Sequence, residues 1–437
     1  MSRILLIGRG PLPGPDTVQM GFSELRTAAF FQAIDTSPAE LRMALLVRQP
    51  TPNPMTSAQA WASTTFIQEE GPGWLEQLHA LAKGADGIVS AGPYNPGRAA
   101  VAIAGDTPLW VDVPGDPMSE LAALARVASS GMEPSAVAAA VAACTAVLSR
   151  ADAMSVISGA QRHAAIGQLG LMGRTLTHHK TPPVHVLPIT SNFGFDEPSL
   201  PNRSDRSPTI ALSGAFNPWF DDERVCAALD EAFRRRPDIS VVVTGGGVAG
   251  FYEDGFRRFQ RWARKHPTRV SIHEWLPHAE MGAVLRAADI GLSMDRSGPE
   301  PELGSRTRLL LFASLGLIPA STVVCELTHE WRAAGALVAL DPDPIVAGEQ
   351  LASIDITDAT PVRRARALMT PQITNPVLAE WCEAPRRVAP GVTAEGVLTT
   401  ELESLKTEIA AIRASPTWTT LNALHSLGVK RFRNRQE

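Results

Sequence analysis

The strongest constraint on the fold is an alternation of short apolar runs with helical patterns, which occurs twice along the chain. Continuous apolar runs without strict polar alternation are typical of a parallel sheet covered on both faces, and their alternation with helices indicates the α/β class. In the first half we expect helices at residues 22–34, 74–82, 118–128 and 135–150, and strands at 3–8, 41–47, 87–90, 109–112, 153–158 and 185–187.

The alternation stops at residues 190–208, which are rich in Pro, Ser, Asn and charge and have no periodicity, as in an interdomain linker. It then restarts, with strands expected at 209–212, 239–244, 270–273 and 290–294 and helices at 223–235, 256–265, 278–287 and 305–315. Two doubly wound domains are therefore predicted at residues 1–190 and 208–360. A helical return segment at 361–395 and an amphipathic helical tail at 396–437 follow them.

Composition narrows the class of protein. The 437 residues are 44% hydrophobic and 19% charged, which suits two globular domains. The net charge of -5 provides no general basic field for nucleic acid. The four cysteines form no CxxC pair, which suits a reducing compartment. The first apolar run is too short for a signal peptide, and no run reaches the roughly 18 apolar residues of a membrane span, so we expect a cytoplasmic protein.

Glycines follow several of the expected strands. Gly10 lies in a loop after the first strand, where a phosphate contact and an ordinary Pro/Gly surface loop are both open. Gly214 and Asn217 follow the first strand of the second half, and Thr244 and Gly245 end the next strand. These positions suit contacts to a diphosphate or a sugar, although turns use glycine equally well. Trp275 and Leu276 are candidates for contacting a nucleotide base, and core packing is the alternative for Trp275.

The segment after residue 294 carries the densest set of polar groups. A loop with Glu300 and Glu302 precedes a helix expected to start at Ser305, so that two arginines fall in its first turn. Arginine there opposes the helix dipole unless an anion is bound, and arginine with a helix N-terminus makes a diphosphate site. The alternatives are a solvated charged loop or an arginine that pairs with Glu300 or Glu302. The candidate residues of the helix start are Ser305, Arg306, Thr307 and Arg308.

No metal or cofactor is predicted. Asp341-Pro342-Asp343 matches a bare DxD pattern, but Asp-Pro pairs are expected in turns. The ten histidines are scattered without an HExxH motif, and the adjacent pair His178-His179 has no carboxylate or cysteine beside it. The sequence contains no GxSxG or GxxxxGK[ST] motif either.

The residues resemble retaining glycosyltransferases of the GT-B fold, family GT4 and its relatives from bacterial polysaccharide gene clusters. The resemblance covers roughly residues 1–345 and rests on residues 151–174, 217–221 and 300–316, with Pro319 after them. It implies two Rossmann-like domains facing a cleft, and transfer of a sugar from a nucleotide-sugar with retention of configuration. Glu300 or Glu302 would orient the sugar, and Arg306, Arg308 and the amides of Gly214 and Ser305 would stabilise the leaving diphosphate.

The chain departs from that family at one position. The family has an acidic residue at the start of a loop and a second one eight positions later in the next helix, which holds the ribose. Here the second position is Leu311 and the first is Leu303, with Glu300 and Glu302 nearby. The ribose is therefore held differently, or the activity has been lost.

The leading hypothesis is transfer to a glycan, lipid-linked or small-molecule acceptor. The first domain is expected to contact the acceptor around Gly10, Asp16, Asp112, Asp116 and Arg162. The alternatives are a sugar-nucleotide epimerase, which needs extra acid/base carboxylates in the cleft, and a non-catalytic sugar-nucleotide-binding or scaffold protein. A dinucleotide enzyme is a further rival, but the acidic residue that follows a GxGxxG motif is lacking.

The tail predicts a separate contact. Leu402, Leu405, Ile409 and Ile412 have the 3-4-3 spacing of a coiled coil, and the chain ends in the basic sequence KRFRNRQE. The tail is similar to a coiled-coil ending of bacterial glycan-assembly transferases. We expect it to mediate self-association or contact with an anionic membrane surface, at the inner face of the membrane.

Overall fold

The computed structural model describes residues 1–18, 21–48, 64–128, 132–175, 181–195, 203, 206–249, 251–388, 394–418 and 420. The pair His178-His179, most of the linker at 196–205 and the basic end at 421–437 lie outside these ranges. Within the described ranges, no helix has the length and apolar character needed to cross a membrane.

The first half forms a seven-stranded parallel sheet with the strand order β3-β2-β1-β4-β5-β6-β7. Its strands are β1 (Arg3–Arg9), β2 (Glu40–Val47), β3 (Thr64–Gln68), β4 (Gly87–Ala91), β5 (Leu109–Val113), β6 (Ala153–Val156) and β7 (Val184–Val186). The helices are α1 (Phe22–Asp35), α2 (Trp74–Ala82), α3 (Asn95–Ala104), α4 (Pro117–Val127), α5 (Pro134–Arg150) and α6 (Gly159–Leu171). β3, α3 and α6 are additions to the elements expected from the sequence.

The second half forms a six-stranded parallel sheet with the order β10-β9-β8-β11-β12-β13. Its strands are β8 (Thr209–Ser213), β9 (Ser240–Thr244), β10 (Val270–Ile272), β11 (Ile290–Ser293), β12 (Ile318–Thr322) and β13 (Val338–Leu340). The helices are α7 (Asp222–Arg235), α8 (Asp254–Ala263), α9 (His278–Arg286), α10 (Pro299–Leu303), α11 (Thr307–Ser314), α12 (Glu326–Ala333) and α13 (Pro344–Ser353). α11 begins two residues after the expected start, and the short α10 replaces part of the expected loop.

Each sheet has a hydrophobic core on both faces. Leu5 and Ile7 of β1 pack into one cluster, whereas Ile4 and Leu6 pack into another. Because successive side chains of a strand point to opposite faces, this separation shows that helices cover both sides of the sheet. The second sheet repeats the arrangement, with Val243 in one cluster and its neighbour Val242 in the other. The continuous apolar runs of the sequence follow from this double burial.

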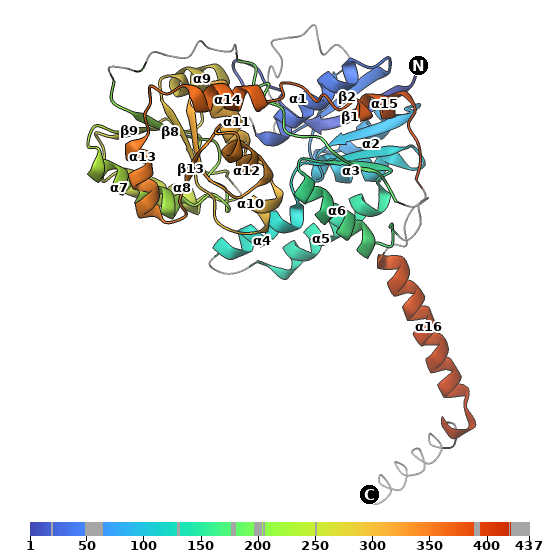
Figure 1. Cartoon of the computed structure of the whole chain (residues 1–437). Helices are drawn as coiled ribbons and strands as arrows, with labels where there is room; N and C mark the ends of the chain where they lie inside the picture. The colour runs from blue at the N-terminus through green and yellow to red at the C-terminus, as the bar shows by residue number, and fades with distance from the viewer. Residues whose placement is uncertain are drawn as a thin grey trace, which may run out of the picture.

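The chain returns to the first domain after completing the second. α14 (Thr360–Leu368) packs on α11 of the second domain, whereas α15 (Val377–Glu383) packs on α1 of the first. The Ser2 hydroxyl donates a hydrogen bond to the Cys382 carbonyl at 2.5 Å, which ties the return segment to β1. α16 (Ala394–Ala414) then extends away from both domains (Figure 1).

Candidate functional site

The carboxyl ends of strands from both sheets meet across the domain boundary. After β6, the Ser158 hydroxyl donates to the Leu303 carbonyl at 2.7 Å, and the Gly159 amide donates to the Glu326 carboxylate at 2.7 Å. From α4, Arg126 donates to the Ser297 carbonyl at 2.5 Å. Ligands of doubly wound sheets bind at this edge of the sheet. The contacts therefore place the candidate site where the two domains face each other.

A pocket lies between α4 and the segment that follows β11. Ala123 and Arg126 line it from the first domain, and Trp219, Arg296 and Glu300 line it from the second. Arg296 is held by Asp221 and Asp222 at the start of α7, with the shorter contact of 2.7 Å to Asp222. The pocket thus has one wall from each domain.

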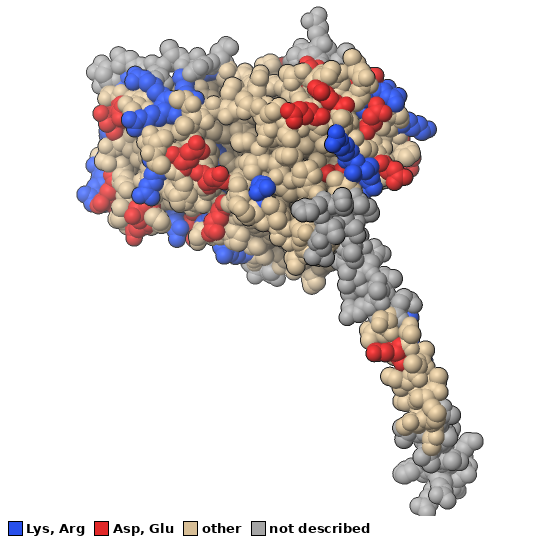
Figure 2. Space-filling model, turned by 45° about the vertical axis from the view of Figure 1, so that its right-hand side comes forward, with Lys and Arg blue, Asp and Glu red and all other residues tan. Residues whose placement is uncertain are grey.

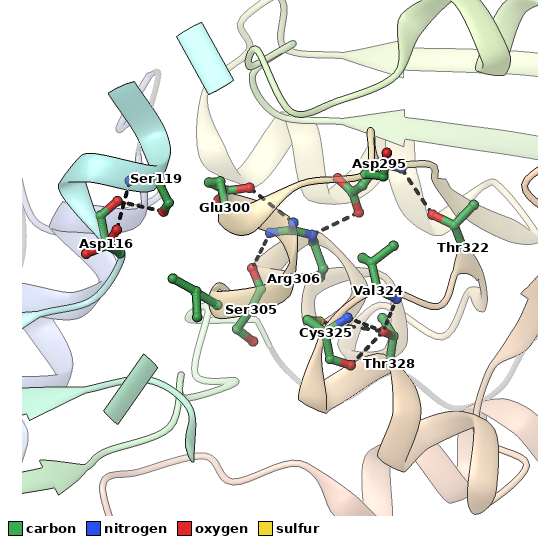
Figure 3. A network of polar contacts seen from close by, with 12 residues as sticks. Asp116, Ser119, Asp295, Glu300, Ser305, Arg306, Thr322, Val324, Cys325 and Thr328 are labelled. Atoms are coloured by element: carbon green, nitrogen blue, oxygen red, sulfur yellow. Dashed lines mark hydrogen bonds and ion pairs between the residues drawn. The ribbon is translucent and has the colours of Figure 1, made fainter. Parts of the chain in front are cut away.

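Arg306 occupies the centre of a buried polar network beside this pocket (Figure 3). Its guanidinium donates to Asp295 at 2.8 Å, to Glu300 at 3.2 Å and to the Ser305 carbonyl at 3.0 Å. Only 4% of Arg306 is exposed. Burial lowers its pKa, but the charges of Asp295 and Glu300 outweigh this effect and raise it. The geometry therefore favours the alternative in which Arg306 pairs with Glu300 and holds the loop.

Arg308 has different surroundings. It is half-buried, donates to the Ala215 carbonyl at 2.9 Å and lies 4.7 Å from the ring centre of Phe220. No carboxylate of the described part of the chain forms an ion pair with it. Burial lowers the pKa of Arg308 to about 10, with Asp295 acting in the opposite direction. Arg308 is therefore a cation in the first turn of α11 whose charge an anionic ligand would balance.

Two glycines bring the β8 and β9 ends close together. Gly214 and Gly245 have positive φ angles of 88° and 96°. A Cβ on Gly245 would lie 2.5 Å from the Gly214 carbonyl oxygen, so no other residue fits there without rearrangement. A Cβ on Gly214 would meet no atom within 4 Å, which leaves open space over this turn. Thr244 is buried, and its hydroxyl donates a hydrogen bond to the Ser213 hydroxyl at 3.0 Å, which links the ends of β8 and β9.

The remaining second-domain candidates have mixed exposure. Trp275 is half-buried and donates its indole N–H to the Gly247 carbonyl at 3.1 Å, with Leu276 half-buried beside it. The Asn217 carbonyl accepts from the Phe220 amide at 2.9 Å. Ser305 and Thr307 are half-buried at the start of α11, and Glu302 is exposed on α10. Leu311 is buried in the core of the second domain at 8% exposure, so it offers no polar contact to a ribose.

The loop after β1 reaches across to the second domain. Gly10 is buried, and its amide donates to the Leu46 carbonyl at 3.0 Å. Asp16 is exposed, and the next two residues contact the start of α9. There the His278 amide donates a hydrogen bond to the Thr17 carbonyl at 2.9 Å, and Val18 forms an isolated antiparallel β-bridge with Pro277. This loop therefore forms a second contact between the domains.

Asp112 corrects the expectation for an acceptor contact. Its carboxylate is fully buried and accepts two hydrogen bonds from Arg26, at 2.7 and 2.9 Å, and one from Ser155 at 2.6 Å. It has no surface that an acceptor can reach, because α1 covers this part of the sheet. Arg162 is exposed, but its Nε donates to the Val184 carbonyl of β7 at 3.0 Å.

Asp116 lies at the start of α4, near two residues that the sequence analysis does not single out, Tyr94 and Glu120. Asp116 caps α4 by accepting a hydrogen bond from the Ser119 amide at 2.8 Å. Figure 3 shows Asp116 across the domain boundary from Glu300. One turn further along α4, Glu120 accepts a hydrogen bond from the Tyr94 hydroxyl. Burial raises the pKa of Glu120 to about 7, and the nearby charges of Glu300 and Asp116 act in the same direction. The spacing of Asp116 and Glu120 on one helix face was the available signal.

Metal binding gains no support from the described residues, where no three His, Cys, Asp or Glu side chains are grouped as ligands. Asp343 caps α13 by accepting from the Ile345 amide at 2.8 Å, and Asp341 accepts from the Asp343 amide at 2.8 Å. The Asp-Pro-Asp stretch therefore forms a capped turn, as its sequence indicates.

No protein-family model and no curated protein matches the sequence. Solved structures match the fold. HepE from Anabaena in complex with UDP-glucose has a TM-score of 0.59 at 14% identity and covers 88% of this chain and 98% of its own. Sucrose-phosphate synthase from Thermosynechococcus elongatus has a TM-score of 0.61 at 14% identity and covers 93% and 100%.

A third match is an α-glucosyltransferase in complex with UDP-glucose and DNA containing an abasic site. Its TM-score is 0.55 at 10% identity, with 88% of this chain and 96% of its own covered. With the two parallel sheets, these similarities show that the chain has the GT-B fold of two Rossmann-like domains, as the sequence predicts.

Proposed function

We propose that this chain is a glycosyltransferase that moves a sugar from a nucleotide-sugar to a glycan, lipid-linked or small-molecule acceptor, with retention and without a metal. The observation that carries the proposal is Arg308. This arginine has no carboxylate partner among the described residues, and it lies between the α11 start and the open turn at Gly214. A diphosphate placed there accepts hydrogen bonds from Arg308 and from amides at the helix start.

Catalysis in this proposal is electrostatic. The departing nucleoside diphosphate gains negative charge as the bond to the sugar breaks, and Arg308 stabilises that charge. Arg306 acts as a positioning residue, because its ion pairs with Asp295 and Glu300 fix the segment between β11 and α11. UDP-sugars are the first donors to test, since two structures of the same fold contain UDP-glucose.

The test is calorimetric titration of UDP and uridine into the wild type and Arg308→Ala. Hydrogen bonds to charged groups contribute about 1.5–3 kcal/mol each, so the Kd for UDP should rise roughly ten- to a hundredfold while uridine affinity changes little. Arg308→Lys should recover part of the loss because lysine keeps the charge without the planar fork. Arg363→Ala, on the exposed face of α14, is the control. Equal losses for UDP and uridine would count against the diphosphate site.

The carboxylates at the domain boundary, Glu120 of α4 and Glu300 of α10, favour a second candidate, a sugar-nucleotide epimerase. Such an enzyme needs acid and base groups beside the bound sugar, and burial raises the pKa of Glu120 to about 7, with Glu300 nearby. Incubating the protein with UDP-sugars in the absence of any acceptor separates the possibilities by NMR. A new epimer supports the epimerase, and sugar transfer that needs an added acceptor supports the transferase. Binding with no turnover in either assay supports a scaffold.

A further inference from the structure

The α16 helix presents an apolar stripe that neither domain covers. Exposed fractions are 50% for Leu405, 47% for Ile409 and 54% for Ile412. Both Figure 1 and Figure 2 show the described part of this helix standing clear of the domains. A single helix of this length is marginally stable in water, because its stability normally comes from packing an apolar face. A partner for the stripe is therefore needed.

The 3-4-3 spacing assigns one heptad register. With Leu402 and Ile409 at position a, Leu405 and Ile412 fall at position d. The same register places Glu401 and Glu408 at position g, and it places Lys406 and Arg413 at position e. Acidic residues therefore occupy the two g positions, and basic residues occupy the two e positions.

This charge pattern selects the orientation of the partner helix. In a parallel pair, a g residue of one helix faces the e residue five positions later on the other helix. Glu408 then faces Arg413 of a second copy, and Glu401 faces Lys406, so each contact joins opposite charges. An antiparallel pair would place g against g and e against e, which brings like charges together. The sequence of this one helix is thus complementary to itself only in the parallel arrangement.

We infer that α16 pairs in register with α16 of a second copy, forming a parallel two-stranded coiled coil that makes the protein a dimer. An anionic membrane fits the helix less well. Its turns carry Glu395, Glu401, Glu403 and Glu408 against only two basic residues, Lys406 and Arg413. Helices that lie on anionic membranes carry a basic polar face instead. The dimer is independent of the proposed activity, because it uses no residue of the pocket.

Sedimentation equilibrium of the full chain tests the apolar seam. The wild type should have the mass of a dimer, and Ile409→Lys should raise the dimer Kd about a hundredfold or more because it puts a charge into the core from both chains. Ala410→Lys adds the same charge at the neighbouring b position, which faces solvent, and should leave the Kd unchanged. A monomeric or trimeric wild type, or equal behaviour of the two variants, would overturn the inference.

Charge reversal tests the orientation. Glu408→Lys and Arg413→Glu each bring like charges together in a parallel homodimer, so each should raise the Kd roughly tenfold. Mixing the two variants should restore association, because both contacts between positions 408 and 413 of the mixed dimer then join opposite charges. Restoration on mixing Glu408→Lys with wild type instead would indicate an antiparallel pair. Loss of binding to phosphatidylserine vesicles in Ile409→Lys, with a monomeric wild type, would assign the stripe to a membrane.

Discussion

The two sheet edges that face the domain boundary differ in which of their charged side chains are paired and which are left without an ion-pair partner. At the first edge Arg26 forms an ion pair with Asp112, whereas Asp116 and Glu120, at the start of α4, form no ion pair among the described residues. At the second edge the carboxylates of Asp295 and Glu300 are paired with Arg306, and Arg308 remains without a carboxylate partner in the described chain. Similar sheets therefore carry unpaired carboxylates at one edge, the acidic wall, and an unpaired cation at the other edge, the cationic wall, within the described chain.

The difference suggests a division of work between the domains. Under the proposed function, a diphosphate would be attracted to the edge with the unpaired cation, and proton transfer to or from a sugar or acceptor would need the carboxylates. Buried ion pairs lie at both edges, Arg26 with Asp112 at the first and Arg306 with Asp295 and Glu300 at the second. The predictions below test whether the pairs are structural and whether the remaining groups carry the function.

The largest effect is expected from Arg26→Met. The substitution leaves the fully buried Asp112 without its cation, and breaking a buried pair in this way costs about 3–5 kcal/mol of unfolding free energy. Urea denaturation measures it, and the UDP affinity of the folded fraction should be unchanged. The double variant Arg26→Met with Asp112→Leu should regain much of the stability, because no unpaired charge remains. A drop in UDP affinity with normal stability would place Arg26 in the ligand site.

The second-largest effect is expected from Arg306→Met, which should lower the free energy of unfolding by about 3 kcal/mol. The loss is smaller than for Arg26→Met because Glu300 lines the pocket and regains some hydration. In contrast to Arg308→Ala, this variant should weaken UDP and uridine by the same factor, because it disturbs the segment between β11 and α11 as a whole. Thermal unfolding of the unliganded protein and calorimetry with both ligands measure the two effects. A selective loss of UDP affinity would show that Arg306 contacts the diphosphate directly.

Much of the fold can be predicted from local sequence, and the elements that the sequence analysis lacks have physical explanations. Most strands and helices were expected within a few residues of their observed ends, because double burial gives continuous apolar runs. β12 was omitted, and it carries Pro319, a residue that sequence rules place at sheet edges. Here Pro319 lies between two partner strands, facing Gly291 of β11 in the register. α3 was omitted because its Asn-Pro-Gly start is typical of a turn.

The site was predictable only in part. The sequence identified the segment around Arg306 and Arg308, but it could not separate the two roles, because Asp295 lies 11 positions away from Arg306 and meets it only through the fold. Glu120 is not evident from the sequence for the same reason, since its raised pKa depends on burial in the folded protein and on the charge of Glu300, which is distant in sequence. Asp112 is an acceptor-side candidate in the sequence analysis, and the sequence contains no sign that it pairs with Arg26 of α1 inside the protein.

Glu120 makes the acidic wall sensitive to pH. The pKa of Glu120 is raised by burial from 4.5 to about 7, so the folded state binds more protons than the unfolded state between these values. Stability should therefore be highest below about pH 4.5 as far as this group is concerned, and should fall as pH rises toward 7. The loss amounts to at most about 3 kcal/mol. Glu120→Gln should flatten the dependence of the unfolding free energy on pH in this range. An unchanged dependence would show that Glu120 does not cause it. Glu76→Gln on α2 is the control.

The smallest effect is expected at the contact between Gly159 and Glu326, which joins the start of α6 to the start of α12. A carboxylate at a helix N-terminus is stabilised by the helix dipole, and with one hydrogen bond it contributes about 1 kcal/mol. Glu326→Ala should therefore shift the balance between closed and open domains about fivefold toward open, without changing the fold of either domain. Small-angle X-ray scattering should show a larger radius of gyration in the unliganded variant, and added UDP should reduce the difference by favouring closure. Glu330→Ala, exposed on the same helix, should leave the scattering unchanged. Gly159→Ala offers an independent check from the other side, since its Cβ would lie 3.2 Å from the Glu326 carboxylate. If both variants scatter like wild type, the acidic and cationic walls are held together by the contacts at Thr17 and Ser158 instead.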